Sequence, residues 1–185
     1  MVDSKEPILE DDEKEKVSLM IEHRLPWLVI GLVGGIALTL VSSKFEHLLS
    51  RNIGLTYFIP IIVYMADAVG TQTQTVYVRN IGKKGTHFLD YLFKEFILGI
   101  AMGGLFGVLA ALFAFFAFKS VEIGVSVGFA MAATMSIAPI IALVVPAVLR
   151  KEHKDPAVGA GPFTTVVQDF LSLLIYFAIA TVIIF

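Results

Sequence analysis

Long runs of apolar residues dominate the chain after Arg24. A helix that crosses about 30 Å of hydrocarbon needs roughly 20 residues, because each residue adds about 1.5 Å. By this measure the pattern predicts five membrane-spanning helices, over residues 25–49, 55–80, 93–118, 123–149 and 162–185. The second and fifth carry polar residues in mid-span, whereas the other three are apolar nearly throughout. We therefore expect an all-α, polytopic membrane protein.

Two segments outside these spans have a different character. Residues 1–24 are densely charged and lack the apolar core of a secretory signal, which predicts an acidic cytoplasmic head. Residues 10–22 fit a short polar helix, with a solvated tail as the alternative. Residues 87–95 are short and mixed in polarity, which predicts an interfacial helix that leads into the third span.

Basic residues indicate the orientation, because cytoplasmic loops carry an excess of Lys and Arg. They gather in the second-to-third connection (Arg79, Lys83, Lys84, His87) and in the fourth-to-fifth connection (Arg150, Lys151, His153, Lys154). We therefore expect the N-terminus inside and the C-terminus outside. Without an organelle-targeting segment, a prokaryotic plasma membrane is the simplest location.

Composition excludes several classes of protein. Hydrophobic residues make up 57% of the chain and charged residues 16%, so neither an ordinary soluble enzyme nor a basic nucleic-acid-binding surface is expected. The chain has no cysteine, which removes thiolate chemistry and Cys-based metal sites. It also lacks HExxH, phosphate-loop and dinucleotide-binding motifs, so we expect neither catalysis nor a resident cofactor.

Two carboxylates lie deep in apolar spans, Asp67 in the second and Asp169 in the fifth. A charged side chain at mid-bilayer costs roughly 2.5–3.5 kcal/mol, and no Lys or Arg lies in the middle of a predicted span to compensate it. A cation from solution is the simplest partner. Oxygen ligands without Cys or intramembrane His suit a hard cation such as Mg²⁺, held through its water shell.

Helical spacing places other polar residues beside these acids. In the fifth span Thr165, Asp169, Ser172 and Tyr176 fall within about 60° of one another, which predicts a wet face. In the second span, the polar residues crowded around Asp67 predict an irregular helix whose carbonyls join the lining; interhelical hydrogen bonding is the alternative. The candidate lining residues are Thr165, Ser172, Thr71, Gln72, Gln74, Gly70 and Gly161.

Glycines four residues apart form three stripes, at Gly31 and Gly35, at Gly99, Gly103 and Gly107, and at Gly124 and Gly128. Such stripes let helix backbones approach closely. Packing within one protomer and contact between subunits both remain open for each stripe. A second copy on a two-fold axis along the membrane normal would place two Asp169 carboxylates opposite one ion.

Three sequence runs resemble the MgtE-type magnesium transporters and channels. The run DPAVGAGPFTTVVQD at residues 155–169, followed by LLIYFAIAT, resembles the signature of the family's last helix. RLPWLVIGLVGG and the GTQ at residues 70–72 are similar to its first and second helices. The resemblance covers residues 20–185.

The resemblance implies a homodimer of five-helix protomers with a cation pathway between them, lined chiefly by the second and fifth helices. It implies that Asp169 is the pore carboxylate that binds hydrated Mg²⁺ and that Asp155 is an acidic residue at the cytoplasmic mouth. The family's cytoplasmic N-domain and CBS domains are not represented, so we expect a different closing mechanism. The family commonly has a Gly-Asn pair where this chain reads Ala66, Asp67, Ala68, so Asp67 is expected to alter selectivity or bind a second ion.

The leading hypothesis is passive permeation of Mg²⁺ or a related divalent cation through a homodimer. One alternative is a carrier in which an intramembrane acid exchanges a proton or Na⁺ for a divalent cation. The other is a membrane subunit that serves a separate cytoplasmic regulatory protein. The sequence alone does not separate these three readings.

Overall fold

A computed structural model describes residues 16–80, 88–153 and 156–185, and within them every regular element is a helix. Residues 81–87 and 154–155, which include part of both predicted basic connections, lie outside the described residues, as do residues 1–15 of the predicted acidic head. In chain order the elements are α1 (Val17–Lys44), α2 (Glu46–Arg51), η1 (Ile53–Phe58, a 3₁₀ helix), α3 (Ile59–Asn80), α4 (Phe88–Phe118), α5 (Val121–Lys151) and α6 (Pro156–Ile184).

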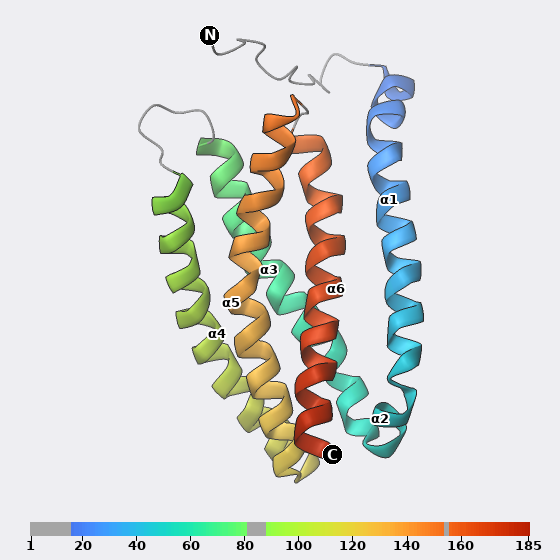
Figure 1. The fold of residues 1–185 in the computed structure, drawn as a ribbon, viewed down its shortest axis with the longest axis vertical. Coiled ribbons are helices and arrows are strands. Elements are labelled where there is room, and N and C mark those ends of the chain that lie inside the picture. Colours follow the sequence, from blue (N-terminus) through green and yellow to red (C-terminus); the bar gives the residue numbers. More distant parts are fainter. Residues whose placement is uncertain (1–15, 81–87, 154–155) are drawn as a thin grey trace.

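Five of the described segments are long and apolar enough to cross a membrane, which confirms the predicted number of spans. They are Val17–Lys44, Ile53–Asn80, Phe88–Phe118, Val121–Lys151 and Gly159–Ile184. The start of α1 and the C-terminus lie at opposite ends of the bundle (Figure 1). The end of α3, the start of α4, the end of α5 and the start of α6 share the end where α1 begins. This arrangement fits the prediction that the first span begins on one side of the membrane and the C-terminus lies on the other. Which side is cytoplasmic stays a prediction.

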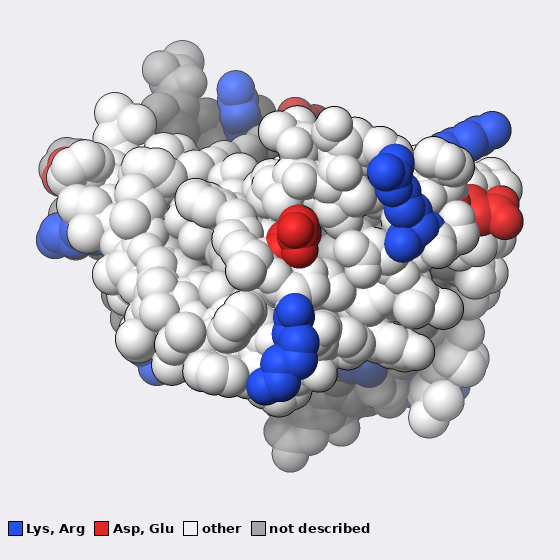
Figure 2. Space-filling view, turned by 90° about the horizontal axis from the view of Figure 1, so that it is seen from below, with Lys and Arg blue, Asp and Glu red and all other residues white. Residues whose placement is uncertain are grey.

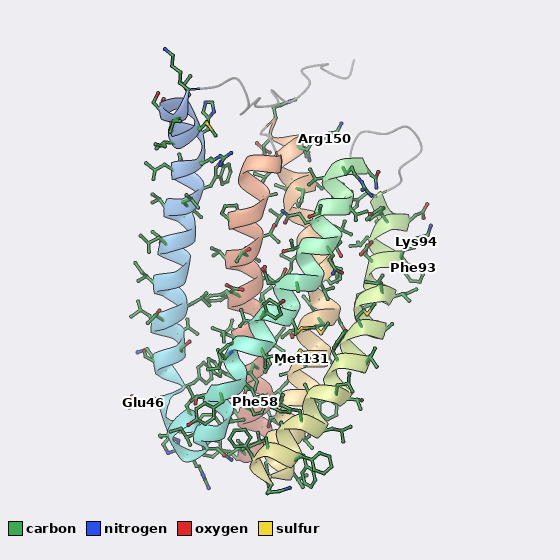
Figure 3. All side chains as sticks on the ribbon, turned by 180° about the vertical axis from the view of Figure 1, so that it is seen from behind. Glu46, Phe58, Phe93, Lys94, Met131 and Arg150 are labelled. Atoms are coloured by element: carbon green, nitrogen blue, oxygen red, sulfur yellow. The ribbon has the colours of Figure 1, made fainter. Side chains whose placement is uncertain are left out.

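The charged side chains labelled in Figure 3 lie toward the two ends of the bundle. Lys94 and Arg150 lie toward the end where α5 finishes, and Glu46 lies at the opposite end (Figure 3). Figure 2 shows the end that carries α2 and the C-terminus as a largely uncharged surface with scattered charges of both signs. Neither sign of charge dominates that face.

Several helices extend beyond their predicted limits. Helix α1 begins at Val17, so Pro26, next to the predicted start of the first span at residue 25, lies inside the helix. The apolar residues Val17, Met20 and Ile21 continue the helix toward the N-terminus. Residues 88–95, predicted as an interfacial helix that leads into the third span, are helical and form the first two turns of the continuous helix α4. His87 lies outside the described residues.

Helix α5 is the central helix of the bundle. It packs against α3, α4 and α6, whereas α1 packs mainly on α6. A Cβ added to Gly103 would lie 2.6 Å from the carbonyl oxygen of Ala132, and one added to Gly107 would lie 2.8 Å from that of Gly128. These glycines therefore bring α4 against α5, and the stripes on these two helices pack within one protomer.

The third glycine stripe has a different environment. A Cβ at Gly31 or Gly35 would meet nothing within 4 Å. The glycine of α1 that does face a neighbour is Gly34, which lies against Val166 of α6. Nearer the start of α6, the Trp27 ring packs against Gly159. The predicted stripe on α1 therefore takes no part in packing within the described protomer.

Candidate cation site between helices α3 and α6

One hydrogen bond joins the two helices that carry the intramembrane aspartates. The Thr165 hydroxyl of α6 donates to Oδ1 of Asp67 on α3, at 3.2 Å. Asp169 lies one turn further along α6 than Thr165, so the two side chains share one face of that helix. Both aspartates are half-buried. Two carboxylates from different helices therefore lie near each other in the middle of the bundle.

The carboxylate of Asp169 is incompletely paired. Its Oδ1 atom is buried and has no hydrogen-bond partner in the described part of the chain. Helix α6 contains no Lys, Arg or His, and the single basic residue of α3 is Arg79, next to its last residue. Because a buried charge needs a partner, this environment favours a cation from outside the chain.

Helix α3 is a continuous α-helix past Asp67, so the predicted irregularity of this helix is wrong. The crowded polar residues keep helical backbone geometry and direct their side chains to different neighbours. Gly70 lies against the carboxamide of Gln168, where a Cβ would come within 3.0 Å of the side-chain atom Cδ. The glycine serves a close approach of α6 rather than a break in α3.

The predicted lining residues occupy three environments. Thr71 and Gln72 are exposed on the outer face of α3, and Gln74 is half-buried. Gly161 is half-buried beside open space on α6. Ser172, in contrast, is 3% exposed, so the predicted wet face is closed at that level within one protomer. Asp155 lies outside the described residues.

Tyr176 closes the same face further along α6. Its ring is fully buried, and its hydroxyl donates to the carbonyl oxygen of Leu55 in η1, at 2.8 Å. The sequence pattern did not reveal this contact, because the partner is a backbone group 121 residues away. The open part of the polar face therefore lies between Gly161 and Asp169.

Sequence reasoning missed a third acid within the bundle, Glu95 of α4. The buried Thr73 hydroxyl of α3 donates to Oε2 of Glu95, at 2.7 Å. A ring pair supports the same contact, with the centroids of Tyr77 and Tyr91 5.5 Å apart. The signal was the helix predicted over residues 87–95, which leads directly into the third span and so places Glu95 two turns inside a continuous helix. Helix α3 therefore makes one polar contact with α4, through Thr73 and Glu95, and another with α6, through Asp67 and Thr165.

The side-chain atoms at the α3–α6 contact that could bind a metal ion are all oxygens. Within the described residues no three His, Cys, Asp or Glu side chains gather in a cluster that would hold a bare metal ion. The contact instead offers two carboxylates, a hydroxyl and, on the outer face of α3, further hydroxyl and amide groups. This donor set suits a hard cation that keeps most of its water.

Comparison with known proteins places the chain in a family. The family model MgtE, described as a divalent cation transporter, matches residues 59–179. The magnesium transporter MgtE of Bacillus subtilis is 33% identical over 162 residues, which are 86% of this chain and 36% of that protein. The protein of the same name from Enterococcus faecalis is 32% identical over 161 residues, 85% of this chain and 36% of its own length.

A third relative is more distant. The magnesium transporter MgtE of Thermus thermophilus is 24% identical over 160 residues, 85% of this chain and 35% of that protein. The chain thus spans about a third of the length of the curated relatives it matches. These bacterial relatives and the five apolar helices fit a multi-pass protein of a prokaryotic plasma membrane. The chain belongs to the MgtE family of divalent cation transporters.

Proposed function

We propose that this chain conducts Mg²⁺, or a related divalent cation, across the membrane along the contact between α3 and α6. Asp169 and Asp67 are the cation-binding carboxylates of this proposal. The observation that carries it is the hydrogen bond from Thr165 to Asp67, which joins the helices of the two aspartates inside their membrane-spanning segments. Family membership and the names of the relatives support the choice of ion.

Charge and hydration favour a hydrated ion. Mg²⁺ releases its waters reluctantly and is commonly bound through one or two carboxylates. Two partly exposed acids suit this mode, because they can accept hydrogen bonds from coordinated water while they offset the ion's charge. Asp155, near the start of α6, and Gly161 complete the proposed path toward the cytoplasmic mouth.

A second copy of the chain completes the path. Thr71 and Gln72 are exposed on the outer face of α3, where hydrocarbon would leave their polar groups without partners. A two-fold axis beside this face would cover them and would bring four carboxylates around one ion path. A homodimer is therefore part of the proposal.

The test is divalent cation flux into liposomes that hold only the purified chain. Wild type is compared with Asp169→Asn, which removes the charge and keeps the side-chain size, and Val182→Ala serves as the control because Val182 is 82% exposed on α6. We expect Mg²⁺ flux in wild type and the control and none in Asp169→Asn. Equal flux in Asp169→Asn would overturn the site.

The same preparation tests whether the chain is sufficient for transport. Mn²⁺, Ca²⁺ and Zn²⁺ are offered in turn, and the oligomeric state is measured by light scattering. A folded wild-type dimer without flux would contradict a self-sufficient path and would favour a membrane subunit that works with a cytoplasmic regulatory protein. Flux that follows an imposed pH or Na⁺ gradient would instead favour a coupled carrier.

A further inference from the structure

Buried polar side chains without hydrogen-bond partners concentrate on one stretch of α6. Within the described residues they include the Thr164 hydroxyl, both amide atoms of Gln168 and Oδ1 of Asp169. Gln168 is 1% exposed and Thr164 is 4% exposed. Buried amides and hydroxyls are nearly always hydrogen-bonded, so this group requires an explanation.

The position of Gln168 connects it to the proposed cation site. It follows Thr164 by one helical turn, so these two side chains share one face of α6, and it directly precedes Asp169 in the chain. Its carboxamide points into the contact with α3, where Nε2 lies 2.9 Å from the place that a Cβ of Gly70 would occupy. Gly70 in turn lies one turn from Asp67 on α3. The carboxamide therefore lies in the same α3–α6 contact as the hydrogen bond from Thr165 to Asp67.

The chemistry of the group points to water as the missing partner. A carboxamide offers two donors and an acceptor, a hydroxyl offers one donor and accepts, and a carboxylate accepts. A metal ion would make no use of the two amide donors, whereas water can both donate and accept hydrogen bonds. A hydrated cation at Asp169 brings such water to this contact.

We propose that Gln168 is a specificity-determining residue that binds the water accompanying the cation at Asp169. It acts on the ion through that water and through Asp169 rather than as a direct ligand. The absence of a side chain at Gly70 provides the room in which the carboxamide lies. This inference rests on the proposed transport function and adds a residue to its site.

The central experiment uses two substitutions at position 168. Gln168→Met keeps an unbranched side chain of similar length and removes all hydrogen bonding, whereas Gln168→Glu keeps oxygen acceptors. Mg²⁺ binding is measured as the rise in melting temperature with Mg²⁺ concentration, and transport as flux in liposomes. Val182→Met, on the exposed part of α6, is the matched control.

We expect Gln168→Met to weaken the apparent Mg²⁺ affinity about tenfold, as the loss of outer-shell partners of metal sites does. Its melting temperature without Mg²⁺ should equal or exceed that of wild type, because two unpaired polar atoms are removed. Gln168→Glu should retain more affinity than Gln168→Met, and the preference for Mg²⁺ over Mn²⁺ should change in Gln168→Met alone. The control should match wild type.

Gly70→Ala provides an independent check. The new methyl group would displace the end of the Gln168 side chain, which is flexible, so the fold is retained. Because both changes remove the same amide from the same place, the double variant with Gln168→Met should bind Mg²⁺ no more weakly than the weaker single variant.

Three results would overturn the inference. The first is a Gln168→Met variant with the Mg²⁺ affinity and ion preference of wild type. The second is an equal loss of affinity in Gln168→Met and Gln168→Glu together with a lower melting temperature, because that result would mean that Gln168 serves packing alone. The third is additive losses in the double variant with Gly70→Ala. Wild-type protein that binds Mg²⁺ without flux would remove the transport proposal and leave the inference standing, and wild type without either response would remove both.

Discussion

Tyr176 of α6 and Leu55 of η1 are both fully buried, and the tyrosine hydroxyl donates to the leucine carbonyl at 2.8 Å. The bond ties α6 to the 3₁₀ helix that precedes α3. It lies seven residues beyond Asp169, or about 10 Å along the helix axis. The contact therefore holds the C-terminal part of α6, beyond the candidate site, against η1.

Removal of this bond should reduce stability. In Tyr176→Phe the Leu55 carbonyl stays buried without its partner, which costs about 1–3 kcal/mol. Thermal unfolding in detergent measures the change, and Tyr57→Phe is the control because Tyr57 is 63% exposed and keeps its ring contact with Phe118. An unchanged melting temperature in Tyr176→Phe would contradict the contact.

The hydrogen bond from Thr165 to Asp67 should affect cation affinity more than stability. Thr165→Val keeps the β-branched shape and removes the donor, so the Asp67 carboxylate loses the hydrogen bond that orients it. A hydrogen bond to a charged group is worth about 1.5–3 kcal/mol, so we expect apparent Mg²⁺ affinity to fall about tenfold or more.

The matched control for Thr165→Val is Thr181→Val. Thr181 is a partly buried threonine of the same helix, and its hydroxyl donates to the Phe177 carbonyl at 2.6 Å within one turn. In the liposome flux assay, Thr165→Val should show the lower Mg²⁺ affinity and Thr181→Val should keep that of wild type. Equal effects of the two substitutions would show that Thr165 has no special relation to the cation.

Neighbouring glycines of α4 should respond in opposite ways to alanine. At Gly103 the new Cβ would lie 2.6 Å from a backbone carbonyl of α5, which has no room to move, so overpacking should cost about 1–3 kcal/mol. At Gly104 a Cβ meets nothing within 4 Å, and alanine should stabilise the helix by about 0.5–1 kcal/mol. Melting temperatures of the two variants test the difference, and a similar change in both would refute the close contact between α4 and α5.

Local patterns predicted the number of spans and the polar faces of the second and fifth helices. Both follow from short-range rules, because the length of an apolar run and the 3.6-residue period depend on neighbouring residues alone. Asp67 and Thr165 were selected in this way, 98 residues apart, and the structure joins them by a hydrogen bond.

Other features depend on long-range packing, which no local pattern contains. Gly70 stays within the continuous helix α3, and the side chain that lies against it, Gln168, comes from another helix. Likewise, the buried state of Tyr176 depends on the carbonyl of Leu55. Polar residues near an intramembrane acid therefore predicted a site, while the shape of the backbone around it needed the neighbouring helices.

The contact between Thr73 and Glu95 should matter for stability and little for transport. Thr73→Val would leave the half-buried Glu95 carboxylate without its donor at 2.7 Å, at a cost of about 1–3 kcal/mol. Glu95→Gln keeps an acceptor oxygen for Thr73, so its cost should be smaller. Because Glu95 lies on α4, away from the α3–α6 contact, we expect both variants to keep the Mg²⁺ affinity of wild type in liposomes. A loss of affinity in Glu95→Gln at an unchanged melting temperature would instead place Glu95 in the cation path, and the proposed path would then have to include the α4 side of α3.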